Sequence, residues 1–390
     1  MFGRPGSIQL ARIFGIRVGV DVSWFVVLFI LIFFLSTQFR QTMDSSDGTA
    51  YVTAVISALL LFASIVVHEL GHAFAARRNG ITVTGITISP LGGFAMLSRE
   101  SRSPREELEV AAAGPFATLL VIVVCVALDL LIVGPGKFLH AAVLSDDVAI
   151  TPTLLTLSWL VTMNAIVLLF NLIPAYPLDG GRIVRGLVWA VTGDRNRGAR
   201  VAARLGQGFA LVLLGLGLWA LISWDAIIGL WCLFVGVTIG GSARAMLAQS
   251  AFAERLDEVR VADVMDEEPV GIPQDLTAEQ ALDDYFLRYR WPWFPVVDAD
   301  GRFVGVVSEE FVRDAVERER PTTPVRELTR TEDVEQLTVG EEQSLRSLLE
   351  ADGLRTLGAI MAVDAAGVLR GVVTAGRLRR ALQSAVAMRP

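Results

Sequence analysis

The sequence predicts a polytopic α-helical membrane protein, with about six transmembrane helices and a small re-entrant β segment, followed by an α/β tail. Three observations support this fold class. Hydrophobic residues make up 53% of the 390 residues and charged residues only 19%. The apolar residues gather in long runs within residues 1–250, whereas residues 251–390 are rich in Asp, Glu and Arg. We therefore expect a membrane domain over residues 1–250 and a soluble tail after it.

Six segments are long and apolar enough to cross a bilayer, since a transmembrane helix needs about 20 mostly apolar residues. They are residues 19–37, 51–76, 108–133, 153–173, 205–222 and 226–246. Basic residues precede the first run, as in a signal peptide, but no small-residue cleavage site follows it. We therefore expect the first span to be retained.

Arginine and lysine in the short loops predict the orientation. With the N-terminus inside, the outer side carries only Arg40 and Lys137. The inner side carries Arg4, Arg12, Arg17, Arg77, Arg78, Arg99, Arg102, Arg105, Arg182, Arg185, Arg195, Arg197, Arg200 and Arg204. An even number of spans returns the tail to the inner side. This predicts a multi-pass protein of the cell membrane whose N-terminus and tail face the cytoplasm.

A β segment is predicted between the second and third spans. In "GITVTGITISPLGGFAMLS", residues 80–98, Val, Ile and Thr alternate with Gly, which is typical of strands. The high apolar content favours a short sheet or a re-entrant hairpin, because unpaired backbone in lipid is costly. Such a segment could offer a strand edge to a peptide. A plain cytoplasmic hairpin is the alternative.

The tail contains a repeat of an amphipathic helix, a strand pair and a second helix. The strand pairs are "FPVVD" with "GRFVGVVS", and "IMAVD" with "GVLRGVVT". Residues 298–301 and 364–367 hold the hairpin turns. We expect two small α/β domains, over residues 251–320 and 321–390. The net charge of −7 gives no indication of nucleic-acid binding.

Two of the three histidines lie in the second span, in "VVHELGHAFAARR", residues 66–78. Ionisable groups within a membrane are expensive, so they indicate a functional site. His68 and His72 are four residues apart, which on a helix is about 40° of rotation and about 6 Å of rise. Both rings can therefore bind one ion, and imidazole nitrogen is a good zinc ligand. Glu69 can lie beside the metal without binding it. The alternative is two hydrogen-bonded core histidines.

A catalytic zinc ion needs a third protein ligand and an open position for water. His140 falls in the predicted external loop, on the wrong side. Asp179, in "NLIPAYPLDGGR", residues 171–182, is the better candidate. Prolines and glycines break the helix at the cytoplasmic end of the fourth span, where irregular backbone is tolerated if it lines a cavity. A loop-capping role for Asp179 is the alternative.

These groups predict a hydrolytic mechanism. One zinc ion bound by His68, His72 and Asp179 would lower the pKa of its water to roughly 7. Glu69 would take the proton and deliver it to the leaving amine. The side-chain amide of Asn171 is a candidate second donor to the oxyanion, and Asn164 is a weaker one. Either asparagine could instead hydrogen-bond between helices.

These motifs resemble the site-2 protease family of intramembrane zinc metalloproteases. The resemblance rests on "HELGH", the "GG" of "SPLGGFAM", "AAAGP" and "NLIPAYPLDGG", within about residues 60–185. It implies His68, His72 and Asp179 as zinc ligands and Glu69 as catalytic base, in an active site that faces the cytoplasm. It also implies substrates that are membrane proteins with a single transmembrane segment, cut within or near the bilayer. Many family members carry a PDZ domain between the two motifs, but the segment here leaves no room for one.

The tail resembles a pair of CBS domains, as in the branch of the family with a C-terminal CBS pair. Such pairs often bind adenine nucleotides through a pattern that ends in an acidic residue. Here Ser308 and Thr374 match the hydroxyl position and are candidate phosphate contacts, but the acidic position holds Phe311 and Arg377. This departure puts the usual nucleotide binding in doubt. A homodimer through the CBS domains, or a gating module without ligand, is the other interpretation.

The leading hypothesis is therefore an intramembrane zinc protease regulated by its CBS pair. The rival is a CBS-gated transporter or channel with a metal-binding helix. Glu69 discriminates between them, because a transport site has no need of a glutamate between two metal ligands. A catalytically inactive scaffold is disfavoured because every expected site residue is present.

Overall fold

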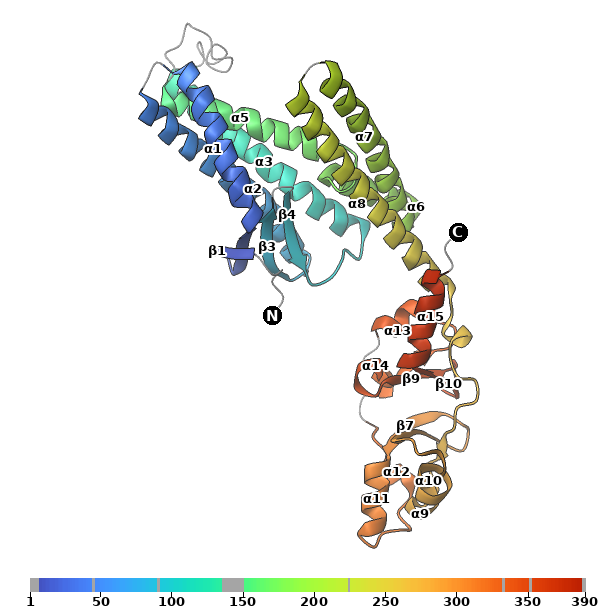
Figure 1. Cartoon of the computed structure of the whole chain (residues 1–390). Coiled ribbons are helices and arrows are strands. Elements are labelled where there is room, and N and C mark those ends of the chain that lie inside the picture. Colours follow the sequence, from blue (N-terminus) through green and yellow to red (C-terminus); the bar gives the residue numbers. More distant parts are fainter. Residues whose placement is uncertain are drawn as a thin grey trace. The chain divides into compact units, whose positions relative to one another are not determined.

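The computed structural model describes residues 7–43, 46–89, 92–134, 151–223, 225–331, 334–350 and 353–387. The chain divides into two compact units, Met1–Leu247 and Ala248–Pro390. Figure 1 shows long helices and one sheet in the first unit, and short helices with small sheets in the second. The boundaries expected at residues 250 and 320 stay a prediction.

Six helices in the described part of the first unit are long and apolar enough to cross a membrane, as the sequence predicts. They are α1 (Val22–Thr42), α2 (Asp47–Arg78), α3 (Pro104–Val133), α5 (Pro152–Asn171), α7 (Arg195–Ser223) and α8 (Ala226–Glu258). Several begin at side-chain caps: Asp21, Ser46, Ser103 and Thr151 each accept a backbone N–H of the first turn. The first helix starts at Val22 and not at residue 19 because Asp21 caps it.

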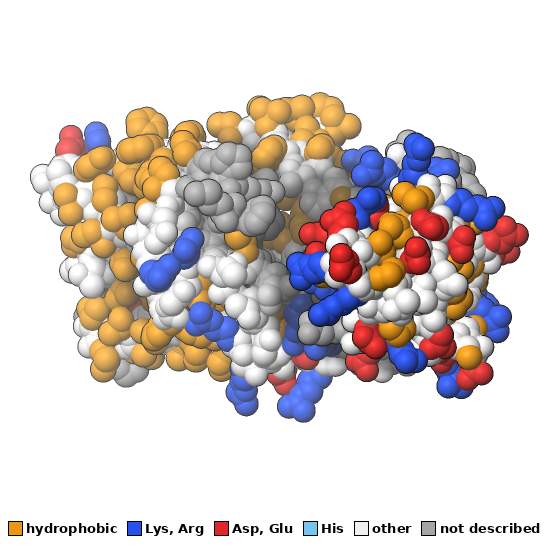
Figure 2. All heavy atoms as spheres, turned by 90° about the horizontal axis from the view of Figure 1, so that it is seen from below, with side chains coloured by type: hydrophobic (Ala, Val, Ile, Leu, Met, Phe, Trp, Pro, Cys, Tyr) orange, Lys and Arg blue, Asp and Glu red, His pale blue; other side chains and the backbone are white. Residues whose placement is uncertain are grey.

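Hydrophobic side chains cover the outside of these helices. Phe33 of α1, Leu131 of α3 and Ile222 of α7 are 70%, 82% and 77% exposed. Figure 2 shows this hydrophobic surface on the first unit, and mixed acidic and basic side chains on the second. Exposed apolar area of this extent is costly in water and favourable in lipid.

The predicted β segment is part of a larger sheet. Strands β3 (Val83–Ser89) and β4 (Gly92–Leu97) pair antiparallel. Strand β2 (Ile16–Asp21) runs parallel to β3 and is preceded by its hairpin partner β1 (Ser7–Ile13), which gives the order β1-β2-β3-β4. The N-terminal hairpin of β1 and β2 was not expected from the sequence. Whether the sheet enters the bilayer stays a prediction.

This sheet packs against the helix that carries the two histidines. Buried residues of β2 and β3 share a core with the last part of α2: Ile16, Val18, Val20, Ile86, Ile88, Leu70 and Ala73. Arg77 of α2 donates to the carbonyl of Phe14, in the β1–β2 turn, at 2.7 Å. The sheet therefore holds the end of α2 that carries the two histidines in place, and Figure 1 shows β3 and β4 beside it.

A helix that the sequence analysis did not predict follows the Pro-rich break after α5. Helix α6 (Asp179–Thr192) begins at Asp179 and ends at Gly193, whose φ is 72°. Gly180 and Gly181 allow its first turn to touch the preceding backbone, because a Cβ on either would overlap backbone atoms of residues 172–176. These glycines let the chain turn back sharply and begin a helix at Asp179.

The described residues of the second unit form two three-stranded sheets, which confirms the α/β character of the tail. One joins β5 (Ile272–Pro273), β6 (Trp293–Val297) and β7 (Phe303–Ser308); the other joins β8 (Thr338–Gly340), β9 (Ala359–Val363) and β10 (Leu369–Thr374). The helices are α9 (Ala278–Ala281), α10 (Leu287–Tyr289), α11 (Glu309–Glu317), α12 (Val325–Leu328), α13 (Leu345–Glu350), α14 (Gly353–Thr356) and α15 (Ala375–Ala387). Short 3-10 segments (Val261–Asp263, Val334–Leu337) and a π segment (Leu282–Phe286) join them.

The two predicted hairpin turns are built alike. The Asp298 carboxylate accepts the N–H groups of residues 300 and 302, and the Asp364 carboxylate accepts those of residues 366 and 368. Gly301 and Gly367 close the turns at φ 78° and 81°, a conformation that favours glycine.

Two hydrophobic cores of the tail each contain residues from both sides of residue 320. Val325 packs with the sheet of residues 272–308, whereas Leu256 and Val261 pack with the sheet of residues 338–374. The pair therefore folds as an interlocked unit.

Candidate metal centre

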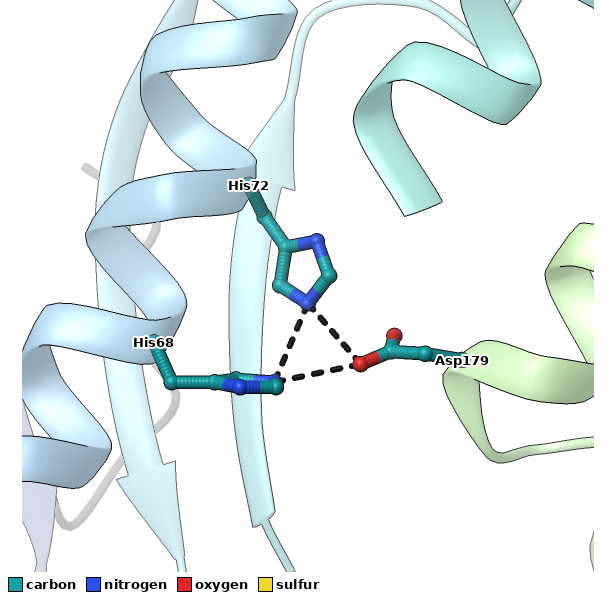
Figure 3. Close-up of side chains that lie close together, drawn as sticks. All are labelled: His68, His72 and Asp179. Atoms are coloured by element: carbon teal, nitrogen blue, oxygen red, sulfur yellow. Dashed lines mark hydrogen bonds and ion pairs between the residues drawn. The ribbon is translucent and has the colours of Figure 1, made fainter. Parts of the chain in front are cut away.

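His68, His72 and Asp179 meet inside the first unit. The two histidines lie one turn apart on α2, and Asp179 is the first residue of α6 (Figure 3). Oδ2 of Asp179 lies 3.1 Å from Nε2 of His68 and 3.2 Å from Nε2 of His72, and the two Nε2 atoms are 3.2 Å apart. All three side chains are buried. Two motifs 107 residues apart in sequence therefore form one cluster.

Residues of α3 contact the second ring nitrogen, Nδ1, of each histidine. Nδ1 of His72 lies 2.7 Å from the carbonyl oxygen of Val110, and Nδ1 of His68 lies 2.9 Å from Oγ1 of Thr118. A carbonyl only accepts, so Nδ1 of His72 must donate. The lone pair of a neutral His72 is therefore on Nε2, which faces Asp179. Metal-binding histidines are oriented in this way by a partner of the second nitrogen.

The geometry of the cluster fits a tetrahedral zinc ion. Zinc with ligand distances of about 2.0–2.2 Å places its ligand atoms roughly 3.3–3.6 Å apart, close to the observed triangle of 3.1–3.2 Å. The Nε2 lone pair of His72 and the carboxylate oxygen of Asp179 are both acceptors, and a cation between them satisfies both. Two imidazoles and one carboxylate also match the ligand set of catalytic zinc sites.

Gly114 makes this arrangement possible. A Cβ at residue 114 would overlap the ring of His72 and come within 2.8 Å of Nε2 of His68. Val110, Gly114 and Thr118 recur every four residues, so they form one face of α3 toward the histidines. In the sequence, "AAAGP" stands out only through the family resemblance. The signal that could have indicated this face is the four-residue spacing of Gly114 and Thr118, which places a residue without a side chain and a hydroxyl on one side of α3.

Glu69 lies beside the cluster and outside the triangle. Its side chain is buried, and Oε1 accepts the backbone N–H of Gly93, in β4, at 3.2 Å. A Cβ at Gly93 would overlap the Glu69 carboxylate, so glycine is required there. The "GG" of the β segment thus has a steric reason that the sequence alone did not reveal.

The ionisation of Asp179 follows from its neighbours. Burial opposes the charged form. Without a metal ion, protons on the Nε2 atoms of His68 and His72 take the place of the cation, and their hydrogen bonds and charge hold the pKa of Asp179 well below its usual range. The carboxylate is therefore the form that a metal ion would meet at neutral pH.

The two asparagines differ in surroundings. Asn171 is the last residue of α5 and half-buried, and its side chain makes no hydrogen bond with another described residue. Asn164 is buried and donates to the carbonyl of Leu160, within its own helix, at 2.9 Å. Asn171 is thus the one of the two whose amide is available. His140 lies outside the described residues.

The two CBS hydroxyls also differ. Ser308 lines a cavity of about 310 Å³ together with Trp293, Phe311 and Arg330. Thr374 is exposed and accepts the backbone N–H of Arg377. The Arg377 side chain donates to the carbonyl of Met265 and pairs with Asp266. The residue that replaces the acidic position of the second repeat is therefore committed to contacts within the tail.

The chain is similar to known zinc metalloproteases. The model of peptidase family M50 matches residues 56–214, and the CBS domain model matches residues 261–310. "Putative zinc metalloprotease Rip3" of Mycobacterium tuberculosis is 34% identical over 323 residues, 83% of this chain and 79% of that protein. Zinc metalloprotease MJ0392 of Methanocaldococcus jannaschii is 32% identical over 337 residues, 83% of this chain and 87% of that protein. The site-2 protease structure from Methanocaldococcus jannaschii aligns with a TM-score of 0.41 and 29% identity, over 62% of this chain and 95% of that chain.

A helical membrane domain with this buried cluster defines a membrane-embedded zinc metalloprotease with a CBS tail. The chain belongs to peptidase family M50, the site-2 protease family.

Proposed function

We propose that this protease hydrolyses peptide bonds in or near the transmembrane segment of membrane-protein substrates that have a single span. The observation that carries the proposal is the position of the cluster. His68, His72 and Asp179 are buried among helices whose outer surfaces are apolar, so the centre lies within the part of the chain that faces lipid. A protease whose centre is buried there is suited to substrates that are themselves in the membrane.

The roles of the side chains follow from their chemistry. His68, His72 and Asp179 would hold one zinc ion per chain, which when bound supplies a Lewis acid and lowers the pKa of water to about 7. Glu69 would accept a proton at its carboxylate and return it to the leaving amine. Its hydrogen bond from Gly93 holds the carboxylate beside the triangle. Asn171 would donate its amide to the developing oxyanion.

Strand β4 is the proposed docking edge for the substrate. It is the last strand of the sheet, and Gly93 within it contacts Glu69. An extended peptide added to this edge would be held by backbone hydrogen bonds beside the catalytic base. Such binding requires that the substrate is extended, and not helical, at the bond that is cut.

The tail and the orientation complete the proposal. The asymmetry of arginines would place the N-terminus, the active site and the tail in or toward the cytoplasm.

The CBS pair would regulate turnover through the cavity beside Ser308, for which an adenine nucleotide is the first ligand to test. Phe311 removes the usual ribose contact, and Thr374 already caps α15, so Ser308 is the better phosphate candidate. Dimerisation through the CBS pair is a further part of the proposal.

The zinc content of the purified chain tests the centre without a known substrate. We expect about one zinc per wild-type chain, and clearly less in Asp179→Ala. Asp194→Ala is the matched control, since Asp194 caps the start of α7 and takes no part in the cluster. Undiminished zinc in Asp179→Ala would remove Asp179 from the ligand set.

A further inference from the structure

Glu107 is a buried carboxylate on the side of α3 that faces the metal centre. It lies in the first turn of α3 and is 1% exposed. Its Oε1 accepts a hydrogen bond from Nη2 of Arg185 at 2.6 Å and lies 3.2 Å from Nε of Arg182, and Ser101 is a third donor. A carboxylate this deeply buried is costly unless it is paired and hydrogen-bonded, and these partners satisfy it.

Both arginines belong to α6, the helix that begins at Asp179. They follow Asp179 by three and six residues, so they lie within the first two turns after it. No side chain caps the N-terminus of α6. Contact with α3 is close, since a Cβ at Gly186 would come within 2.9 Å of the Leu108 side chain. The ion pairs therefore anchor the start of α6 to α3.

The same helix α3 holds the other two ligands. Val110 and Thr118 contact His72 and His68, and Glu107 precedes Val110 by three residues on the same face. Helix α3 thus contacts, directly or through the arginines of α6, all three side chains that would bind the metal. It fixes the histidine rings directly and fixes Asp179 through two arginines.

We propose that Glu107 is a positioning residue for the metal centre: its ion pairs with Arg182 and Arg185 fix α6, and thereby hold the Asp179 carboxylate against His68 and His72. The inference rests on the proposed role of Asp179 as a zinc ligand. Charge-assisted hydrogen bonds are short and directional, so they suit this task. Without them α6 is free to shift, and a displaced carboxylate binds zinc more weakly.

The test is the zinc affinity of full-length Glu107→Gln, measured by competition with a chromogenic chelator. We expect binding roughly 10–100-fold weaker than in the wild type, the usual effect of losing an outer partner of a metal ligand. Glu109→Gln is the control, because Glu109 lies on the same helix but contacts Arg105 and Asn79 and not α6. Wild-type affinity in Glu107→Gln would overturn the inference and leave the zinc site intact.

A second variant separates positioning from folding, since Glu107→Gln leaves two partly buried arginines without their carboxylate partner. In Glu107→Gln with Arg185→Gln this uncompensated charge is reduced, so we expect the thermal midpoint to recover while zinc binding stays weak. Recovery of both would show that Glu107 acts only on stability, and would overturn the inference. A wild-type chain that binds no zinc would refute the proposed function, and this inference with it.

Discussion

The hydroxyl of Thr118 lies 2.9 Å from Nδ1 of His68, which is fifty residues earlier in the chain. This contact leaves Nε2 of His68 directed at Asp179. The partner on α3 thus decides which nitrogen of a ligand on α2 faces the metal position.

Thr118→Val therefore tests the outer partner of His68. Valine has nearly the same shape but cannot hydrogen-bond, so the ring loses its orientation. We expect zinc affinity to fall roughly 10–100-fold, with little change in helix content. Thr162→Val is the control, because the hydroxyl of Thr162 bonds only to Ser158 in its own helix. Equal affinities in the two variants would contradict the assignment.

Glu69→Gln separates the chemistry from metal binding. Glutamine keeps the size of the side chain and can still accept from Gly93, but it cannot take a proton. We expect zinc content to match that of the wild type, while cleavage of a single-span substrate falls on the order of 10²–10⁴-fold or more. Full activity in this variant would defeat the mechanism.

Gly114→Ala tests the steric requirement at the centre. The added methyl group would overlap the ring of His72, so α2 and α3 must separate or the ring must rotate. We expect loss of zinc and of activity. Gly208→Ala in α7 is the matched control, since a Cβ there meets nothing within 4 Å. The control gains up to about 1 kcal/mol of helix propensity. An active Gly114→Ala enzyme with normal zinc would show that this packing is not needed.

Removal of residues 251–390 tests whether the tail regulates turnover. We expect turnover on a membrane-protein substrate to change, in either direction, because α8 continues from the membrane unit into the core of the tail through Leu256. The measurement compares initial rates of the two proteins at equal zinc content. Identical rates would make the tail a passive appendage.

Asp364 predicts a pH dependence in the stability of the tail. The backbone N–H group of Val368, with that of Ala366 and the guanidinium of Arg370, holds the pKa of Asp364 below its usual range, although desolvation acts in the opposite direction. A depressed folded-state pKa stabilises the fold above the unfolded-state pKa of about 3.9, and this contribution is lost as pH falls through the folded value. We expect Asp364→Asn to lower the thermal midpoint of the tail at pH 7, with the difference shrinking as the pH falls below the unfolded-state pKa. A constant difference across this range would exclude the charge as its cause.

Much of the fold could be predicted because membrane spans are local. Each needs only a run of apolar residues, and the six helices follow those runs. The hairpins at Asp298 and Asp364 were predictable for the same reason, since a turn depends on four neighbouring residues. Strand β2 was not predicted because its apolar pattern merges with the first span. Its parallel pairing with β3 was not predictable because it joins residues more than sixty positions apart.

The sequence by itself determined which residue types are available for the chemistry: "HELGH" sets two histidines on one helix face, and "PLDGG" supplies a carboxylate where a helix can begin. Only the tertiary structure decided that Asp179 meets both histidines, that Gly114 and Gly93 leave room for their neighbours, and that Glu107 ties α6 to α3. The physical reason is that periodicity fixes the face on which a side chain lies. Which helix packs against that face is set by interactions summed over the whole bundle.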